Sequence, residues 1–180
     1  HHRPYDPNGG TLTMAVCPIL VYPDPILKQV AEAVGAVDDT VVAVIQDLVD
    51  TMVASGHSVG VAAPQIGVLR RILVVDVSKS KLGKENNHGL LEMVNPDIIE
   101  KSGSKIMREG CMSVPDYTGN VTRAERIVVE FINRTGQLRV IEATGFEAVA
   151  IQHELDHLDG LLFLDRVSSL KTDLYRRKGK

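Results

Sequence analysis

The stretch QHELDHLDG, residues 152–160, places two histidines four positions apart with a glutamate beside the first. On a helix, positions i and i+4 lie on one side about one turn apart, so the imidazoles of His153 and His157 can bind one metal ion. The glutamate of this H-E-x-x-H pattern, Glu154, lies beside the first histidine. The alternative is that both histidines are buried and hydrogen-bonded, and the motif alone does not decide between the two.

A third ligand is offered by EGCMSVP, residues 109–115. Cys111 is the candidate, since a cysteine ligand must be a thiolate and a divalent ion supports that form by its own charge, and the small Gly110 lets the backbone fold tightly beside it. The alternative is a buried cysteine without a ligand role, which is how we interpret Cys17.

The loop GHSVGVAAPQIG, residues 56–67, is rich in glycine and alanine. Small residues allow a ligand to approach the backbone, and Gln65 offers an amide N–H to an oxygen that develops negative charge. Taken alone, such a loop is equally typical of an ordinary turn from helix to strand.

The patterning around these stretches predicts the elements that position them. Residues 38–56 repeat apolar positions at helical spacing, with Asp38 or Asp39 as the cap and Gly56 as the stop. A second helix from Phe146 to Asp159 carries both histidines on one face. Strands are predicted at 70–77, 91–99, 127–132 and 138–143. The fold class is therefore α+β, with short, mostly antiparallel strands packed around a central helix that carries the H-E-x-x-H motif.

Length and composition favour one domain with a substantial core, since the 180 residues are 44% hydrophobic and no linker divides them. The net charge of -3 argues against specific DNA binding. Two distant cysteines without a signal peptide predict a reducing, intracellular setting. No apolar run reaches the roughly 18 residues that a membrane span needs.

We expect three segments along the chain. Residues 1–13 are polar, begin with two histidines, and are interpreted as a disordered leader or tag remnant. Residues 14–166 form the catalytic domain, and 167–180 form a basic tail. Residues 166–180 contain six basic side chains and one acidic one, a net of +5. This tail is either a solvated end or a docking element for a polyanion such as ribosomal RNA.

Together, in this order and spacing, the three stretches resemble the peptide deformylase family. The family carries G-x-G-φ-A-A-x-Q, E-G-C-L-S and Q-H-E-x-D-H, and this chain has SVGVAAPQ, EGCMS and QHELDH. The resemblance extends from YPDP at 22–25 to GLLFLDR at 160–166. Two positions depart from the family pattern: Ser58 replaces the first glycine of the loop, and Met112 replaces the leucine.

The resemblance implies a hydrolase that removes the N-formyl group from the N-terminal methionine of newly made proteins and releases formate. It implies one divalent ion, Fe2+ in cells, while Zn2+, Ni2+ and Co2+ also suit the ligands. The partners would be N-formylmethionyl nascent peptides, in a bacterial cytoplasm or in an organelle after leader removal.

The implied residue roles fall into four groups. The metal ligands are Cys111, His153 and His157. The general base is Glu154, and the oxyanion is stabilised by the Gln65 side chain and the Met112 backbone N–H. The substrate-binding residues are Gly60 and Val61. The residues that support the ligands from behind are Glu109, Arg123, Gln152 and Asp156.

Two other functions share parts of this pattern. A zincin-type protease has H-E-x-x-H but takes its third ligand after the helix, where this chain offers only Asp159, Asp165 and Asp173. A metal-binding module without catalysis would leave Gln65 and Glu154 without a role. Metal-loaded protein that lacks activity would identify the second.

Overall fold

The computed structural model describes residues 16–178, so the leader predicted at 1–13 lies outside the described residues. The helical elements are η1 (Pro25–Lys28), α1 (Asp39–Ser55), η2 (Ala63–Ile66), α2 (Gly145–Leu158) and η3 (Phe163–Arg166). The strands are β1 (Gly60–Ala62), β2 (Ile72–Val75), β3 (Leu91–Ser102), β4 (Lys105–Cys111), β5 (Val114–Arg123), β6 (Arg126–Ile132), β7 (Leu138–Thr144) and β8 (Leu174–Arg176).

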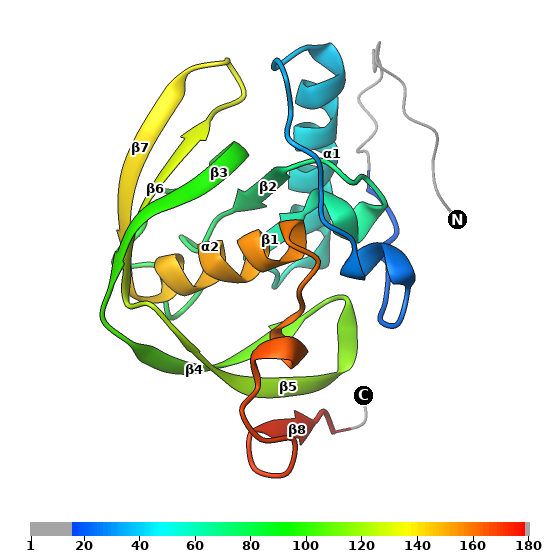
Figure 1. Ribbon diagram of the computed structural model, residues 1–180, viewed down its shortest axis with the longest axis vertical. Coiled ribbons are helices and arrows are strands. Elements are labelled where there is room, and N and C mark those ends of the chain that lie inside the picture. Colours follow the sequence, from blue (N-terminus) through cyan, green and yellow to red (C-terminus); the bar gives the residue numbers. More distant parts are fainter. Residues whose placement is uncertain (1–15, 179–180) are drawn as a thin grey trace.

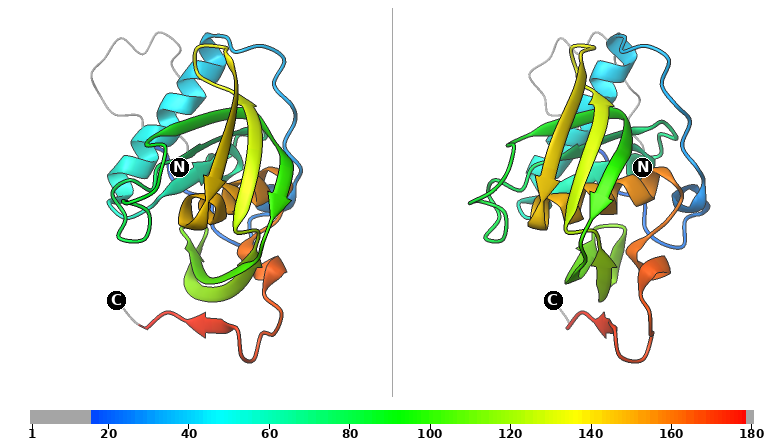
Figure 2. Two further views of the ribbon diagram at one scale, coloured as in Figure 1. Left: turned by 90° about the vertical axis from the view of Figure 1, so that its left-hand side faces the viewer. Right: turned by 60° about the vertical axis from the view of Figure 1, so that its left-hand side comes forward.

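The strands form two antiparallel sheets. One has five strands in the order β1-β2-β3-β6-β7, and the other has three in the order β4-β5-β8. In all views α2 lies between α1 at one end of the molecule and the β4–β5 hairpin at the other, with β8 beyond the hairpin (Figures 1 and 2). The α+β class with antiparallel sheets, predicted from the sequence, is confirmed.

Local sequence explains where α1 begins and ends. The Asp38 side chain accepts a hydrogen bond from the Val41 backbone N–H at 3.0 Å, which caps the first turn. Gly56 adopts a left-handed conformation at φ 78° and closes the last turn. The helix predicted at residues 38–56 is therefore confirmed, and its apolar face lies in a core with β1 and β2.

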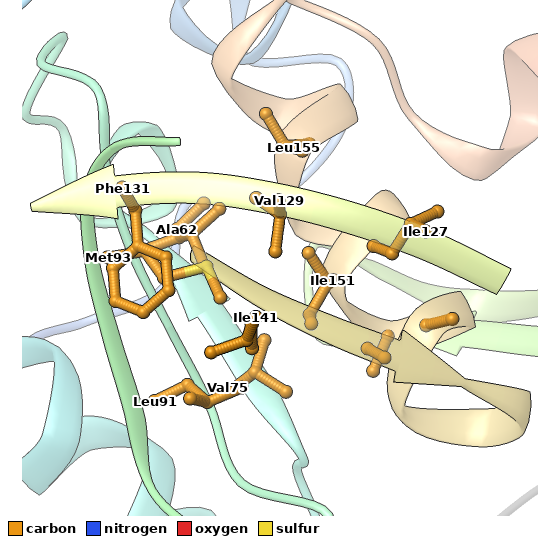
Figure 3. Close-up of a cluster of buried hydrophobic side chains, with 14 of the residues drawn as sticks. Ala62, Val75, Leu91, Met93, Ile127, Val129, Phe131, Ile141, Ile151 and Leu155 are labelled. Carbon is orange, nitrogen blue, oxygen red and sulfur yellow. The ribbon is translucent and has the colours of Figure 1, made fainter. Parts of the chain in front are cut away.

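The second helix, α2, packs against the five-stranded sheet. Ile151 and Leu155 meet Val129 and Phe131 of β6 and Met93 of β3 in the main hydrophobic core (Figure 3). The polar side chains of the histidine motif are buried as well. A helix with so much of its surface buried holds its side chains rigidly, and this suits a site that must fix ligand positions.

The sequence predictions of strands were correct for four elements and missed four others. The strands predicted at 70–77, 91–99, 127–132 and 138–143 correspond to β2, β3, β6 and β7. The missed strands are β1, β4, β5 and β8. In β8, Tyr175 pairs with Thr118 of β5, so this part of the basic tail lies hydrogen-bonded against the sheet. Within the described residues, no helix is long and apolar enough to cross a membrane.

Candidate metal centre and active site

The structure brings the three predicted ligands together where α2 passes the end of β4. Their ligand atoms all lie within 4.8 Å of one another, and all three residues are buried. Cys111 Sγ lies 3.4 Å from His157 Nε2. The imidazole rings of His153 and His157 meet edge to face, with centroids 5.3 Å apart. One sulfur and two imidazole nitrogens are the donor set expected of a catalytic zinc or iron site.

A chain of ion pairs holds His153 from behind. Its Nδ1 lies 2.8 Å from Glu109 Oε1, which leaves Nε2 to face the cluster. Arg123 donates to Glu109 through Nε at 2.5 Å and Nη2 at 2.8 Å, and to Asp156 through Nη1 at 2.9 Å. Arg166 in turn donates to both oxygens of Asp156 at 2.7 and 2.8 Å. A carboxylate behind a ligand imidazole fixes its orientation and raises its basicity.

The electrostatics of the cluster favour a thiolate. Burial by itself would raise the pKa of the Cys111 thiol, but the positive charge of His157 and hydrogen bonds with both imidazoles hold that pKa well below its usual value. Burial by itself would lower the pKa of His153, yet hydrogen bonds with Cys111 and Glu109 hold that pKa well above its usual value. A thiolate in this cluster is stabilised by nearby positive charge, and a divalent cation held by the same three side chains would provide such a charge. The residues present fit a metal ion.

Glu154 lies beside the ligands and is only 4% exposed. Its Oε2 is 3.9 Å from His153 Nε2, and its Oε1 has no hydrogen-bond partner among the described residues. Burial raises the pKa of this carboxyl to about 7. A buried acceptor atom that is left unpaired, on a group that titrates near neutral pH, is suited to take a proton from water.

Gly60 of β1 makes room for Glu154. A Cβ atom built on Gly60 would lie 2.8 Å from Glu154 Oε2 and 2.9 Å from its Cγ, closer than real contacts. The loop at residues 56–67 can therefore approach Glu154 closely because residue 60 has no side chain. The neighbouring Val61 is fully buried in the core that joins β1 to α1.

Gln65 is held with its amide nitrogen toward the cluster. Its Oε1 accepts from the Ala62 backbone N–H at 3.0 Å, and its Nε2 donates to Ser113 Oγ at 3.0 Å and lies 3.5 Å from Cys111 Sγ. These partners fix which end of the amide faces the site. Ser113 is fully buried and was missed by sequence reasoning, although it stands in EGCMS.

The serine at position 58 is accommodated without backbone strain. Among the described residues other than glycine, only Asn95 has a positive φ, so Ser58 does not need the conformation that glycine permits. Its hydroxyl donates to the Gly60 carbonyl at 2.9 Å and accepts from the Gly60 backbone N–H at 3.4 Å. The substitution therefore adds hydrogen bonds within the loop.

Beside the cluster lies a cavity of about 540 Å³. Its lining includes the predicted residues Gly60, Gln65, Glu109, Cys111, Met112, His153 and Glu154. Phe146, Val149 and Met107 form an apolar part of the wall. Arg177 of the tail also lines it, which sequence reasoning missed. The cavity provides room for a small apolar side chain beside the cluster.

Gln152 and the downstream aspartates lie elsewhere. Gln152 bonds the backbone N–H and carbonyl of Ala124 at 3.1 and 2.9 Å, so it ties α2 to the β5–β6 connection. Asp159 pairs with Arg71, and Asp165 pairs with Lys28. Neither aspartate belongs to the ligand cluster found in the described residues, which argues against the zincin arrangement.

Fold and site together define an α+β protein with a thiolate and two imidazoles around one point and a buried carboxylate beside them. A family model described as Polypeptide deformylase matches residues 16–173. The chain belongs to this family of hydrolases, which remove the N-formyl group from nascent peptides.

Relatives and solved structures agree over most of the chain. A peptide deformylase of Thermodesulfovibrio yellowstonii is 41% identical over 167 residues, which cover 93% of this chain and 98% of the relative. A peptide deformylase structure from Ehrlichia chaffeensis in complex with actinonin superimposes with a TM-score of 0.81 at 37% identity, covering 88% and 92% of the two chains. A Met-Ala-Ser-bound structure of a class I type b peptide deformylase from Acinetobacter baumannii superimposes with a TM-score of 0.79 at 32% identity, covering 86% of this chain and 100% of the other.

Proposed function

We propose that the cavity beside Cys111, His153 and His157 is where an N-formylmethionyl peptide is hydrolysed to formate and a free N-terminus. The observation that carries the proposal is the buried Glu154, whose Oε1 has no partner among the described residues and whose Oε2 lies 3.9 Å from His153 Nε2, one of three ligand atoms within 4.8 Å of one another. A metal-binding module without catalysis has no use for such a carboxylate.

We propose that these three side chains hold one divalent ion, Fe2+ in cells, with Zn2+, Ni2+ and Co2+ also accommodated by the same donors. When bound, the ion would polarise the formyl carbonyl and acidify a water molecule. The chain's own contribution is to fix the donors in place. Glu109, Arg123 and Asp156 hold the His153 ring through the ion pairs described above, and Gln152 anchors α2. In this account α2 is the central element around which the strands pack.

Glu154 moves the protons. It accepts one from the attacking water and then delivers it to the leaving amine, which becomes the new N-terminus. A pKa of about 7 suits both steps, since the group is then neither too weak a base nor too weak an acid near neutral pH. Gln65 Nε2 and the Met112 backbone N–H donate hydrogen bonds to the oxygen that becomes negative when the formyl carbon is attacked.

The peptide would lie along β1. This strand is at the edge of its sheet, so the backbone groups of Gly60 and Val61 on that edge can pair with an extended chain. The methionine side chain would enter the apolar part of the cavity at Phe146, Val149 and Met107. The solved relatives, one bound to Met-Ala-Ser and one in complex with actinonin, support a peptide-like ligand.

We also propose that residues 14–166 form the catalytic domain, in the cytoplasm, with 167–180 as a basic segment and 1–13 as a leader or tag remnant. All predicted ligands precede residue 167, although β8 continues the β4–β5 sheet. The basic segment is proposed to dock on ribosomal RNA. Removing its four last basic residues, within 174–180, should weaken salt-sensitive co-sedimentation with ribosomes, and unchanged pelleting at low salt would exclude docking.

The experiment is formate release from formyl-Met-Ala-Ser by anaerobically prepared protein, with the metal measured on the same sample. Acetyl-Met-Ala-Ser is the matched control substrate, because it differs only in the acyl group. We expect rapid formate release and little acetate release. Cleavage of an internal peptide bond would indicate a protease, and metal-loaded protein that releases no formate would indicate a binding module.

A further inference from the structure

The last described residues bring a cation to the substrate cavity. Strand β8 pairs with β5, and the Arg177 backbone N–H donates to the Asp116 carbonyl at 2.8 Å. The sheet order is β4-β5-β8, so the Arg177 side chain must cross β5 to reach β4. The side chain does cross β5: a Cβ atom built on Gly110 of β4 would lie only 2.5 Å from Arg177 Nη2. Arg177 also lines the cavity beside the ligand cluster.

Gly110 explains how the guanidinium can lie there. Gly110 lies at a register shift between Glu109 and Cys111, next to the ligand in sequence. Its φ is not positive, so the backbone does not need glycine for its conformation. The absence of a side chain instead opens the outer face of β4 to Arg177. The sequence interpretation, that Gly110 allows tight folding beside the cysteine, is therefore supplemented by a second reason.

The exposed charged residues that line the cavity are both arginines, while the exposed Asp116 of β5, opposite Arg177, is not part of the lining. Arg108 also lines the cavity, and its guanidinium carbon lies 3.6 Å from the ring centre of Tyr175 in β8. The carboxylates of Glu109 and Glu154 lie in the same wall but are buried. No described residue forms an ion pair with Arg177. Two guanidinium groups that line one cavity, one of them without an ion pair among the described residues, have the chemistry to bind an anion.

We propose that Arg177, presented by β8 and supported by Arg108, is a specificity residue that binds a carboxylate of the substrate peptide downstream of the formylmethionine. The inference rests on the proposed function of the same cavity. Gly110 is next to Cys111 in sequence, so a peptide whose formyl group is held at the cluster would bring a later residue near Arg177, since each residue of an extended chain advances it by about 3.3 Å. The carboxylate is either an acidic side chain or the free C-terminus of a short peptide.

The expected selectivity is modest because Arg177 is exposed. Exposed ion pairs contribute about 0.2 to 1 kcal/mol, which corresponds to a preference of roughly 1.4-fold to fivefold in kcat/KM for an acidic peptide. The preference should shrink at high salt, since exposed charges are screened.

The test compares kcat/KM for formyl-Met-Ala-Asp-Ala amide with kcat/KM for the same peptide carrying Asn in place of Asp. The comparison is repeated with the Asp at the second and at the fourth position of the peptide. The free acid and amide of formyl-Met-Ala-Ser distinguish a chain terminus from a side chain. The wild type should prefer acidic peptides at one of these positions at least. Arg177→Gln should bring the ratio close to one, and Arg177→Glu should reverse it. Arg176→Gln is the matched control, because it removes the same charge from an adjacent residue that does not line the cavity.

The affinity of the deformylated products, Met-Ala-Asp-Ala amide and its Asn counterpart, is measured by calorimetry on the same samples. If no formate is released from any peptide, the proposed function is wrong. The ratio of the affinities for the Asp and Asn products then still tests whether Arg177 binds a carboxylate. A wild-type ratio of one with every peptide overturns it. The inference is also overturned if the preference for acidic peptides survives Arg177→Gln, or if Arg176→Gln removes it as completely as Arg177→Gln does.

Discussion

Replacing Gly60 with alanine should damage catalysis by moving Glu154. The added Cβ would lie 2.8, 2.9 and 3.0 Å from the Glu154 Oε2, Cγ and Cδ atoms. Non-bonded heavy atoms are comfortable at roughly 3.5 Å or more, so the carboxylate must retreat by about 0.5 to 1 Å. A misplacement of about 1 Å in a reacting group costs up to roughly 100-fold in rate. We therefore expect kcat/KM to fall about 10- to 100-fold.

The assay is formate release at matched metal content, with thermal unfolding measured in parallel. Overpacking of a buried site also lowers the free energy of unfolding, by about 1 to 3 kcal/mol. Gly35→Ala is the control, because a Cβ at Gly35 meets no atom within 4 Å. Metal occupancy of Gly60→Ala should remain that of the wild type. A variant that keeps kcat/KM within about twofold would refute the reasoning.

Three further predictions concern the cluster and its support. Iron-loaded protein should lose activity in air faster than nickel-loaded protein, because iron(II) and the Cys111 thiolate both oxidise, and equal decay would contradict this. Arg123→Met should lower the free energy of unfolding by about 3 kcal/mol or more, measured in urea, since it leaves the buried Glu109 carboxylate with only the His153 imidazole as a partner; a loss below 1 kcal/mol would count against it. Burial by itself would raise the pKa of Asp156, but hydrogen bonds and charge from the neighbouring arginines lower this pKa below 3.8. The ionised Asp156 should therefore contribute fully to the free energy of unfolding above pH 3.8, and this contribution should be lost as the pH falls further. Urea unfolding at pH 6 and pH 3 would show the loss.

Elements with strong local signals were predictable from the sequence. Helix α1 has a capping aspartate, a helical apolar period and a terminal glycine, and it begins and ends at the residues those signals indicate. The β4–β5 hairpin was missed because much of β4 is exposed and has no regular apolar alternation. Strand β8 has three residues, two of them with polar tips, and forms only through its partner β5.

The site was predictable in its residue types but not in its supporting contacts. The order of Gln65, Cys111 and the histidine motif along the chain is enough to suggest one cluster. The Arg123–Glu109 pair depends on the register of a hairpin that was not predicted. The clearance of Gly60 for Glu154 depends on how β1 meets α2, and no local pattern encodes that distance.

The most direct test of the central claim is to measure bound metal and formate release together in Glu154→Gln. The substitution keeps the size of the side chain and leaves Cys111, His153 and His157 untouched, but it removes the proton acceptor. We expect one metal ion per chain, as in the wild type, with kcat lower by about 100- to 10,000-fold. Loss of the metal in proportion to the loss of activity would make Glu154 a ligand, and full activity with the metal retained would mean that another group accepts the proton.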